Sequence, residues 1–410
     1  MQHPPAAFGG KTLSAFVAGT AREPKAAAPA QAAISVELRE IGDMAPLVEA
    51  WRDLLRRCLE TNIFLDPDFA LPAFAYLRPR NFKILVAFEP GAERRLLALM
   101  PLALPAMRFG LARVPVHKQA ALGLPLLDRA EAAPALAALL DAIRQLPAAP
   151  SALVFSDIPR DGPTFRLLSD RFADRGALRT FREYQRAALF PAADAQVNRK
   201  TKARKNDSRL LRRLAEHGSL SYRISRGAEA IGAMAEFLAL ESAGWKGASR
   251  TALASAPERA AFAGAMAEGL ARSGKLRVES LDLDGKAVAM GLIIEDAGTT
   301  YFWKTTYDEA HAALSPGVLF VRELTNRLAA GRASVKIDSC AMPDHPMIDR
   351  LWPKRITLLD LGIAVVPGLR PRLAFAAEAL HRFCRQAAKG LLLRNSSGKA
   401  PVAQTWRTRS

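Results

Sequence analysis

Ser315, Pro316 and Gly317 are the residues whose types and spacing first suggest chemistry. Ser315 suits a helix N-cap and Pro316 the first helical position, and apolar residues follow at helical spacing. The aromatic and β-branched run 301–307 predicts a strand just before them. A strand, a loop and a helix whose first N–H groups lack partners make a place where phosphate can bind. An ordinary strand-to-helix crossover that serves only packing fits the same pattern.

Two tryptophan–lysine pairs are further candidates for a binding site. Trp245 and Lys246 stand between glycines in a break after a helix, where they can line a site or serve as core and loop residues. Trp303 and Lys304 alternate along their strand, so we expect at most one of them to face a cleft. We assign no site to His345, because its spacing from nearby aspartates is common by chance. No catalytic triad or metal-ligand pattern stands out, so no metal is expected.

The positive charge is concentrated in two stretches. The chain has 410 residues and a formal net charge of +18. Residues 199–213 hold eight Lys or Arg against Asp207, and residues 367–410 hold nine against Glu378. This distribution favours local contacts with a polyanion over a globally basic nucleic-acid binder. Solvated basic helices without a partner fit the same distribution.

Cysteine usage and hydropathy favour a cytoplasmic protein. The three cysteines, Cys58, Cys340 and Cys384, are odd in number and far apart, which suits a reducing compartment. The apolar run 96–107 is too short to span a bilayer and contains two prolines. Residues 1–20 lack the continuous apolar core of a signal peptide.

The chain divides into two α/β segments between two terminal stretches. Residues 34–194 predict strand, helix, two strands, helix, strand, helix and strand, which is the order of a layered α/β domain. Residues 195–366 predict the basic stretch, a strand, two helices, an antiparallel meander, a helix and further strands. The Ala/Pro-rich residues 1–33 are expected to be disordered, and residues 367–410 to form a basic, partly helical tail.

Several motifs of the second segment resemble one family. Residues 237–247 contain leucine and glutamate followed by Gly-Trp-Lys-Gly, which is similar to a signature of the CelD/BcsL-type GNAT-like acetyltransferases. The strand 302–308, the Ser-Pro-Gly helix start at 315–317 and the pair Ile337-Asp338 resemble the same family, and the basic stretch 199–213 takes the place of its basic helix. The resemblance is most specific over residues 195–365.

The resemblance implies a fold and an activity. It implies an α/β fold of two GNAT-like halves, each a mixed, largely antiparallel sheet flanked by helices, related in shape to the Fem aminoacyltransferases. The activity would be transfer of an acyl group, acetyl in the simplest case, from acyl-CoA to an amine or hydroxyl, without a metal. The glycine-rich loop of ordinary GNAT enzymes is replaced by Ser315-Pro316-Gly317.

The resemblance also assigns roles to residues. It places the strand 300–307 beside the thioester and the helix from Pro316 at the pyrophosphate. The predicted CoA contacts are Ser315, Gly317, Val318, Thr305 and Trp303, and the predicted acceptor contacts are Trp245, Lys246, Lys304 and Tyr307. Direct transfer requires a proton acceptor. The candidates are Asp338, which we prefer, with Asp308 and Glu241, and then Glu309 and His311.

The sequence therefore predicts a cytoplasmic acyltransferase that uses acyl-CoA. A cell-surface polysaccharide or its precursor enters as an acceptor only through the family's association with cellulose synthesis. Two alternatives stay open: a Fem-like transferase that takes its acyl group from aminoacyl-tRNA, and a non-catalytic protein whose basic patches bind RNA or an anionic membrane.

Overall fold

The computed structural model describes residues 33–78, 82–92, 94–105, 110–114, 117–147, 149–173, 176–191, 201–330 and 335–396. All the described secondary structure lies in one compact unit, Ile34–Ser410. Apart from Ala33, the segment predicted to be disordered lies outside the described residues, and so does the predicted boundary near residue 195.

The first half alternates strands and helices. Its main elements are β1 (Ser35–Arg39), α1 (Val48–Arg57), α2 (Pro67–Leu77), β2 (Phe82–Phe88), β3 (Leu96–Ala103), β4 (Leu111–Val114), β5 (Leu126–Leu127), α3 (Ala132–Arg144), β6 (Ala152–Pro159), α4 (Pro163–Arg171) and β7 (Leu178–Leu189). The sequence prediction confined the last strand to 187–190. The strand is longer because polar residues 178–186 pair along β13 while their side chains stay largely exposed.

The second half repeats this order after a basic helix. Its elements are α6 (Thr201–Ala215), β8 (Leu220–Arg226), α7 (Ala228–Ala243), α8 (Trp245–Ala248), η4 (Leu253–Ser255), α9 (Pro257–Arg272), β9 (Leu276–Leu283), β10 (Lys286–Asp296), β11 (Thr299–Tyr307), η5 (Glu309–Leu314), α10 (Pro316–Ala330), β12 (Lys336–Asp338), α11 (Ile348–Leu351), β13 (Lys354–Ala364) and α12 (Leu369–Ser396). The meander β9–β10–β11 and the start of α10 at Pro316 match the sequence prediction.

Both halves contribute to one mixed sheet. Its order in the described residues is β1-β2-β3-β4-β6-β13-β7-β12-β11-β10-β9-β8, with β5 beside β3. The described pairs are antiparallel except β4 with β6 and β11 with β12. The order reads almost the same from either end, because each half presents four strands and then a parallel neighbour. The fold class is confirmed: two GNAT-like halves, each with a largely antiparallel sheet and flanking helices.

The last strands of the two halves are exchanged. β7 ends the first half but pairs with β12, and β13 ends the second half but pairs with β6. β7 and β13 then pair with each other over most of their length. The two halves are therefore joined by backbone hydrogen bonds through the centre of the sheet.

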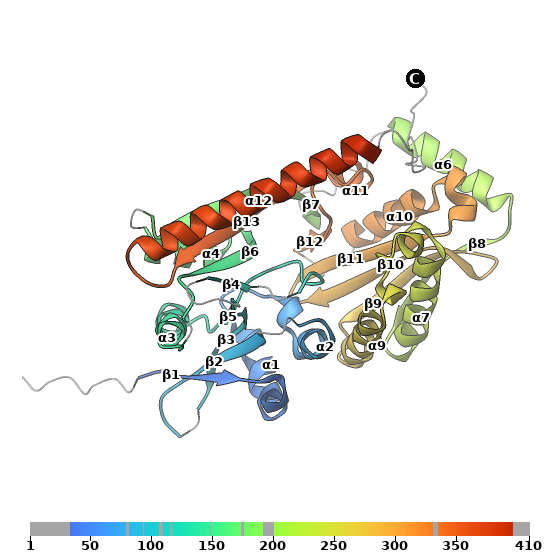
Figure 1. The fold of residues 1–410 in the computed structure, drawn as a ribbon. Helices are drawn as coiled ribbons and strands as arrows, with labels where there is room; N and C mark the ends of the chain where they lie inside the picture. Colours follow the sequence, from blue (N-terminus) through green and yellow to red (C-terminus); the bar gives the residue numbers. More distant parts are fainter. Residues whose placement is uncertain are drawn as a thin grey trace, which may run out of the picture. The chain divides into compact units, whose positions relative to one another are not determined.

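Helices cover both faces of the second half of the sheet. In Figure 1, α7 and α9 lie on one side of β9–β11 and α10 on the other. The alternation of β11 agrees with this, since Tyr301 and Trp303 belong to the core shared with α9 and Phe302 to the core shared with α10. The first half packs on the α9 side, where Phe69 of α2 meets Phe262 of α9 edge-on, with ring centroids 5.4 Å apart.

Candidate active site

The parallel strands β11 and β12 separate after a short pairing. They pair only from Thr299 with Lys336 to Tyr301 with Asp338. β11 then continues to Tyr307, while the chain leaves the sheet after Asp338. A pocket of about 160 Å³ occupies the gap. A cavity of about 150 Å³ can hold benzene, so this volume suits a small acyl group and its thioester.

Residues from four segments line this pocket, which we call the wedge pocket. They are Lys246 of α8, Phe302, Trp303, Lys304 and Thr305 of β11, Ser339, Cys340 and Ala341 after β12, and His345, Met347 and Ile348 before and at the start of α11. Four of the residues predicted to form the site, Trp303, Lys304, Thr305 and Lys246, are therefore brought together here. Among the described residues, no group of three His, Cys, Asp or Glu is arranged to hold a metal ion.

A β-bulge places two successive side chains on the same side of β11. Leu292 of β10 pairs with Lys304, whereas Ile293 pairs with Phe302, so Trp303 is the extra residue. The Lys304 ammonium lies 5.0 Å from the centroid of the Trp303 ring. Both residues line the wedge pocket. The expectation that only one of them faces the cleft is wrong, because it assumed unbroken alternation.

Trp303 is a rigid wall of the pocket. Its ring is 7% exposed and lies against Phe69 and Phe262, with centroids 5.6 and 6.2 Å away. Its indole N–H donates to the carbonyl of Gln119 in the first half, at 3.1 Å. The first half therefore fixes one side of a pocket that the second half builds.

Lys304 is a lysine without an acid partner in the described residues. Burial lowers the pKa of its ammonium to about 8; Glu241 opposes this and Lys246 adds to it. At pH 7 about one tenth of a group with such a pKa is neutral, far more than for an ordinary lysine. A neutral amine in the wedge pocket can accept a proton.

Lys246 is held at the mouth of the pocket by fixed acceptors. Its ammonium donates to Oε1 of Glu241 at 3.1 Å and to the carbonyl of Thr305 at 2.6 Å. Oε2 of Glu241 accepts the N–H of Leu253 at 2.8 Å, so both carboxylate oxygens of this buried residue are engaged. Trp245 is 56% exposed and does not line the pocket; its N–H donates to Glu309.

The Gly-Trp-Lys-Gly segment forms the short helix α8 where a loop was predicted. A Cβ atom at Gly247 would overlap the carbonyl oxygen of Ser242. We therefore expect Gly247→Ala to lower the free energy of unfolding by about 1–3 kcal/mol, since the backbone must shift. Urea denaturation measures this, with Gly232→Ala as the control because nothing lies within 4 Å of a Cβ there. Equal stabilities of the two variants would contradict the overlap.

The carboxylates predicted as proton acceptors do not line the wedge pocket. Asp338 is 1% exposed and lies beside Arg186, with its oxygens 3.2 and 3.3 Å from Nη1. Its Oδ1 also accepts the N–H of Cys340 at 2.8 Å. Asp308 caps η5 by accepting the N–H of Ala310 at 2.9 Å. These contacts orient the backbone around the site.

Two polar residues of the pocket were not predicted from the sequence. His345 accepts the N–H groups of Met347 and Ile348 at Nδ1, both at 3.3 Å, and burial lowers its pKa. A neutral imidazole that accepts at Nδ1 carries its proton on Nε2 and can donate it. Burial and Asp338 raise the pKa of the Cys340 thiol, which stays protonated. No local spacing marks either residue, because the turn after β12 brings them to the pocket.

The helix start at α10 differs from its predicted geometry in one respect. Ser315 is left-handed, with φ 54°, and its carbonyl accepts the N–H of Val318 at 3.0 Å. The Val318 N–H, predicted to be free for phosphate, is therefore engaged. Gly317 packs under Tyr307, since a Cβ there would lie 3.3 Å from the Tyr307 ring. Tyr307 is two residues from Thr305, so this helix start lies about 7 Å along β11 from the pocket.

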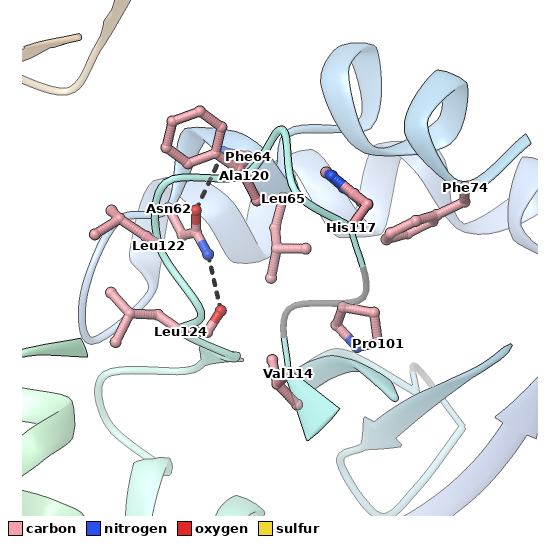
Figure 2. Close-up of a pocket in the computed structure, with 10 residues that line it drawn as sticks. All are labelled: Asn62, Phe64, Leu65, Phe74, Pro101, Val114, His117, Ala120, Leu122 and Leu124. Atoms are coloured by element: carbon pink, nitrogen blue, oxygen red, sulfur yellow. Dashed lines mark hydrogen bonds between the residues drawn. The ribbon is translucent and has the colours of Figure 1, made fainter. Parts of the chain in front are cut away.

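The corresponding place in the first half is filled. Beyond the parallel pair β4·β6 lies a pocket of about 10 Å³, room for about one water molecule. Figure 2 shows Phe64, Leu65 and Phe74 around it, and Asn62 linking the N–H of Phe64 to the carbonyl of Leu124. Burial lowers the pKa of the neighbouring His117 to about 4, which leaves it neutral.

The family comparison agrees with the order of elements in the second half. Residues 201–338 match the family described as an acetyltransferase (GNAT) domain. Comparison with curated proteins gives no match. Residues 201–338 are thus a GNAT-type acetyltransferase domain, and the protein is an acyltransferase enzyme.

Solved structures with a similar chain course come from three proteins. The C-terminal domain of a protein described as a lysylphosphatidylglycerol synthetase from Agrobacterium fabrum is 13% identical, with a TM-score of 0.49 over 81% of this chain and 95% of that one. L-PGS from Bacillus licheniformis is 12% identical, with a TM-score of 0.48 over 81% and 95%. FemX is 11% identical, with a TM-score of 0.47 over 76% and 90%.

Proposed function

We propose that the second half transfers an acyl group from acyl-CoA, acetyl-CoA in the simplest case, to an amine or hydroxyl acceptor at the wedge pocket. The observation that carries this proposal is Lys304, a lysine with a lowered pKa and no acid partner among the described residues, lining a small pocket beside an unpaired stretch of β11. Acyl-CoA supplies the activated thioester as co-substrate.

The pocket residues divide the proton transfers of this reaction. A new bond forms between the acceptor nitrogen or oxygen and the acyl carbon, the carbon–sulfur bond breaks, and the acceptor loses a proton. Neutral Lys304 takes that proton and passes it towards the leaving thiolate. The Nε2–H of His345, with backbone N–H groups of β11, donates to the oxygen that becomes negative. Lys246 and Trp303 hold the walls in place.

The phosphates of the donor would lie at the start of α10 and along α6. α6 packs against η5 and α10 through Leu210 and Leu214, and Arg322 of α10 pairs with its Asp207 at 2.9 Å. This leaves Arg212 and Arg213 exposed on the helix. Cations there can replace the helix donor that Val318 no longer offers.

Changing these cations tests the donor. Arg212→Gln combined with Arg213→Gln should weaken acetyl-CoA binding about five- to tenfold at low salt and less at high salt. Titration calorimetry measures this, with Arg166→Gln and Arg171→Gln of α4 as the control pair, since both are exposed in the first half. Gly317→Glu is a poorer test, because the new side chain would strike Tyr307.

A thermal-shift titration with acetyl-CoA or tRNA decides between the donors. Stabilisation by acetyl-CoA supports the proposal; salt-dependent stabilisation by tRNA alone would instead favour an aminoacyl-tRNA donor. The CelD/BcsL subgroup and a polysaccharide acceptor stay predictions from the sequence resemblance.

A further inference from the structure

The helix α12 carries an apolar stripe that no described part of the chain covers. Leu369, Leu373, Leu380 and Phe383 are 70%, 68%, 63% and 68% exposed. At 100° per residue these four positions fall on one face of the helix, and they extend over about 21 Å of its axis. Figure 1 shows α12 running along β13.

The opposite face of α12 holds the helix on the protein. Phe375 is 2% exposed and lies against Phe181 of β7, with ring centroids 5.7 Å apart. Glu378 is 5% exposed and pairs with Arg113 of β4 and with Arg382. The helix is thus fixed on the sheet by one face, and its apolar stripe is presented outward.

Cations border the stripe on both sides. On the same helical projection, Arg372 lies along one border, and Arg370, His381 and Arg385 lie along the other. Glu378 is the single acid among residues 369–388, and its two ion pairs neutralise it on the buried face. The exposed side of α12 is therefore apolar in the middle and positive at its edges.

We propose that α12 docks this protein onto an anionic lipid surface, with the stripe buried at the level of the acyl chains and the bordering cations at the headgroups. A helix lying in the interface has this arrangement. Anionic headgroups attract each nearby Lys or Arg by about 1 kcal/mol. Within the described residues, no helix is long and apolar enough to span a bilayer.

The stripe decides between a membrane and the other occupants. A nucleic acid would contact the cations but would offer nothing to four exposed aliphatic and aromatic side chains. A second copy of the chain would cover the stripe but would bring an equal set of cations against the first, and like charges repel. An anionic lipid surface satisfies both the apolar and the charged residues.

Flotation of the full-length protein with vesicles tests the docking. The wild type should float with mixed phosphatidylcholine–phosphatidylglycerol vesicles and not with pure phosphatidylcholine. Leu373→Ser combined with Leu380→Ser should weaken binding about tenfold or more. The control pair is Ile224→Ser with Ile231→Ser, which are 40% and 42% exposed on β8 and α7. Arg372→Gln with Arg385→Gln should abolish the preference for phosphatidylglycerol.

The outcomes separate the occupants. Unchanged flotation of the leucine variant, with the same unfolding midpoint as wild type, would overturn the proposal. So would binding of a single-stranded RNA without vesicle binding, or a dimer in sedimentation velocity that the leucine variant abolishes while vesicles do not bind. Acetyl-CoA titration of the leucine variant should match wild type, so failure of docking and failure of the proposed acyl transfer can be told apart.

Discussion

Lys304→Met should lower kcat for acyl transfer by about 10²–10⁴-fold while the protein still binds acetyl-CoA, because positioned proton transfer contributes about that much. Methionine keeps the length and the contact with Trp303 but cannot accept a proton. Single-turnover kinetics with acetyl-CoA and a panel of amine acceptors measures the rate. Lys286→Met on β10, an exposed lysine, is the matched control.

The pH profile identifies the role of Lys304. Only the neutral amine accepts a proton, so kcat should rise with pH through an apparent pKa of about 8 and level off above it. Lys304→Arg keeps the positive charge but cannot lose it, and it should be as inactive as Lys304→Met. A Lys304→Met variant that retains the wild-type rate and profile would remove Lys304 from the mechanism.

The same pKa shift changes stability in a way that does not depend on activity. The pKa of Lys304 is about 8 in the folded chain and 10.5 ordinarily, so between these values the unfolded state binds more protons. The free energy of unfolding should then rise with pH across this window, relative to Lys304→Met. Denaturation at several pH values measures the difference, and parallel curves would contradict the shift.

Asp338→Ala should lower the free energy of unfolding by about 3–5 kcal/mol, because it leaves the buried Arg186 guanidinium without its carboxylate. Arg186 is 3% exposed and Asp338 1%. Arg186 also donates to the carbonyl of Ala121 at 3.0 Å, so the loop beside the wedge pocket should loosen as well. Denaturant unfolding measures the loss.

A double-mutant cycle separates the pair from its surroundings. Arg186→Met should destabilise by a similar amount, whereas Arg186→Met with Asp338→Leu should recover much of it, since no charge is left unpaired. The exposed pair Arg327 and Glu323 of α10 is the control, with an expected coupling of about 0–1 kcal/mol. A loss below that range for Asp338→Ala would show that the buried pair is not needed for folding.

Local patterns predicted most elements of the second half. Alternation in 276–307 gave the meander, and the Ser-Pro-Gly sequence gave the start of α10, because strand period and helix caps are written in neighbouring residues. The exchange of β7 and β13 could not be predicted in this way. Which strand pairs with which depends on contacts between residues more than 150 positions apart, for which a single sequence carries no periodic signal.

The site shows the same division. The pairs at 245–246 and 303–304 were found because strand type and flanking glycines are local signals. The role of Asp338 was misjudged, since Arg186, which takes up its charge, lies 152 positions earlier in the chain. The bulge at Trp303 was invisible because it arises from the register with β10.

The strand exchange sets an order of events during synthesis. The edge of β6 waits for β13, which the ribosome makes roughly 200 residues later, and at about 5–20 residues per second this takes about 10–40 s. During that time the nascent first half exposes an open sheet edge that can pair with another chain. We expect chaperone dependence, and aggregation of truncations that end before β13, to be properties of this topology.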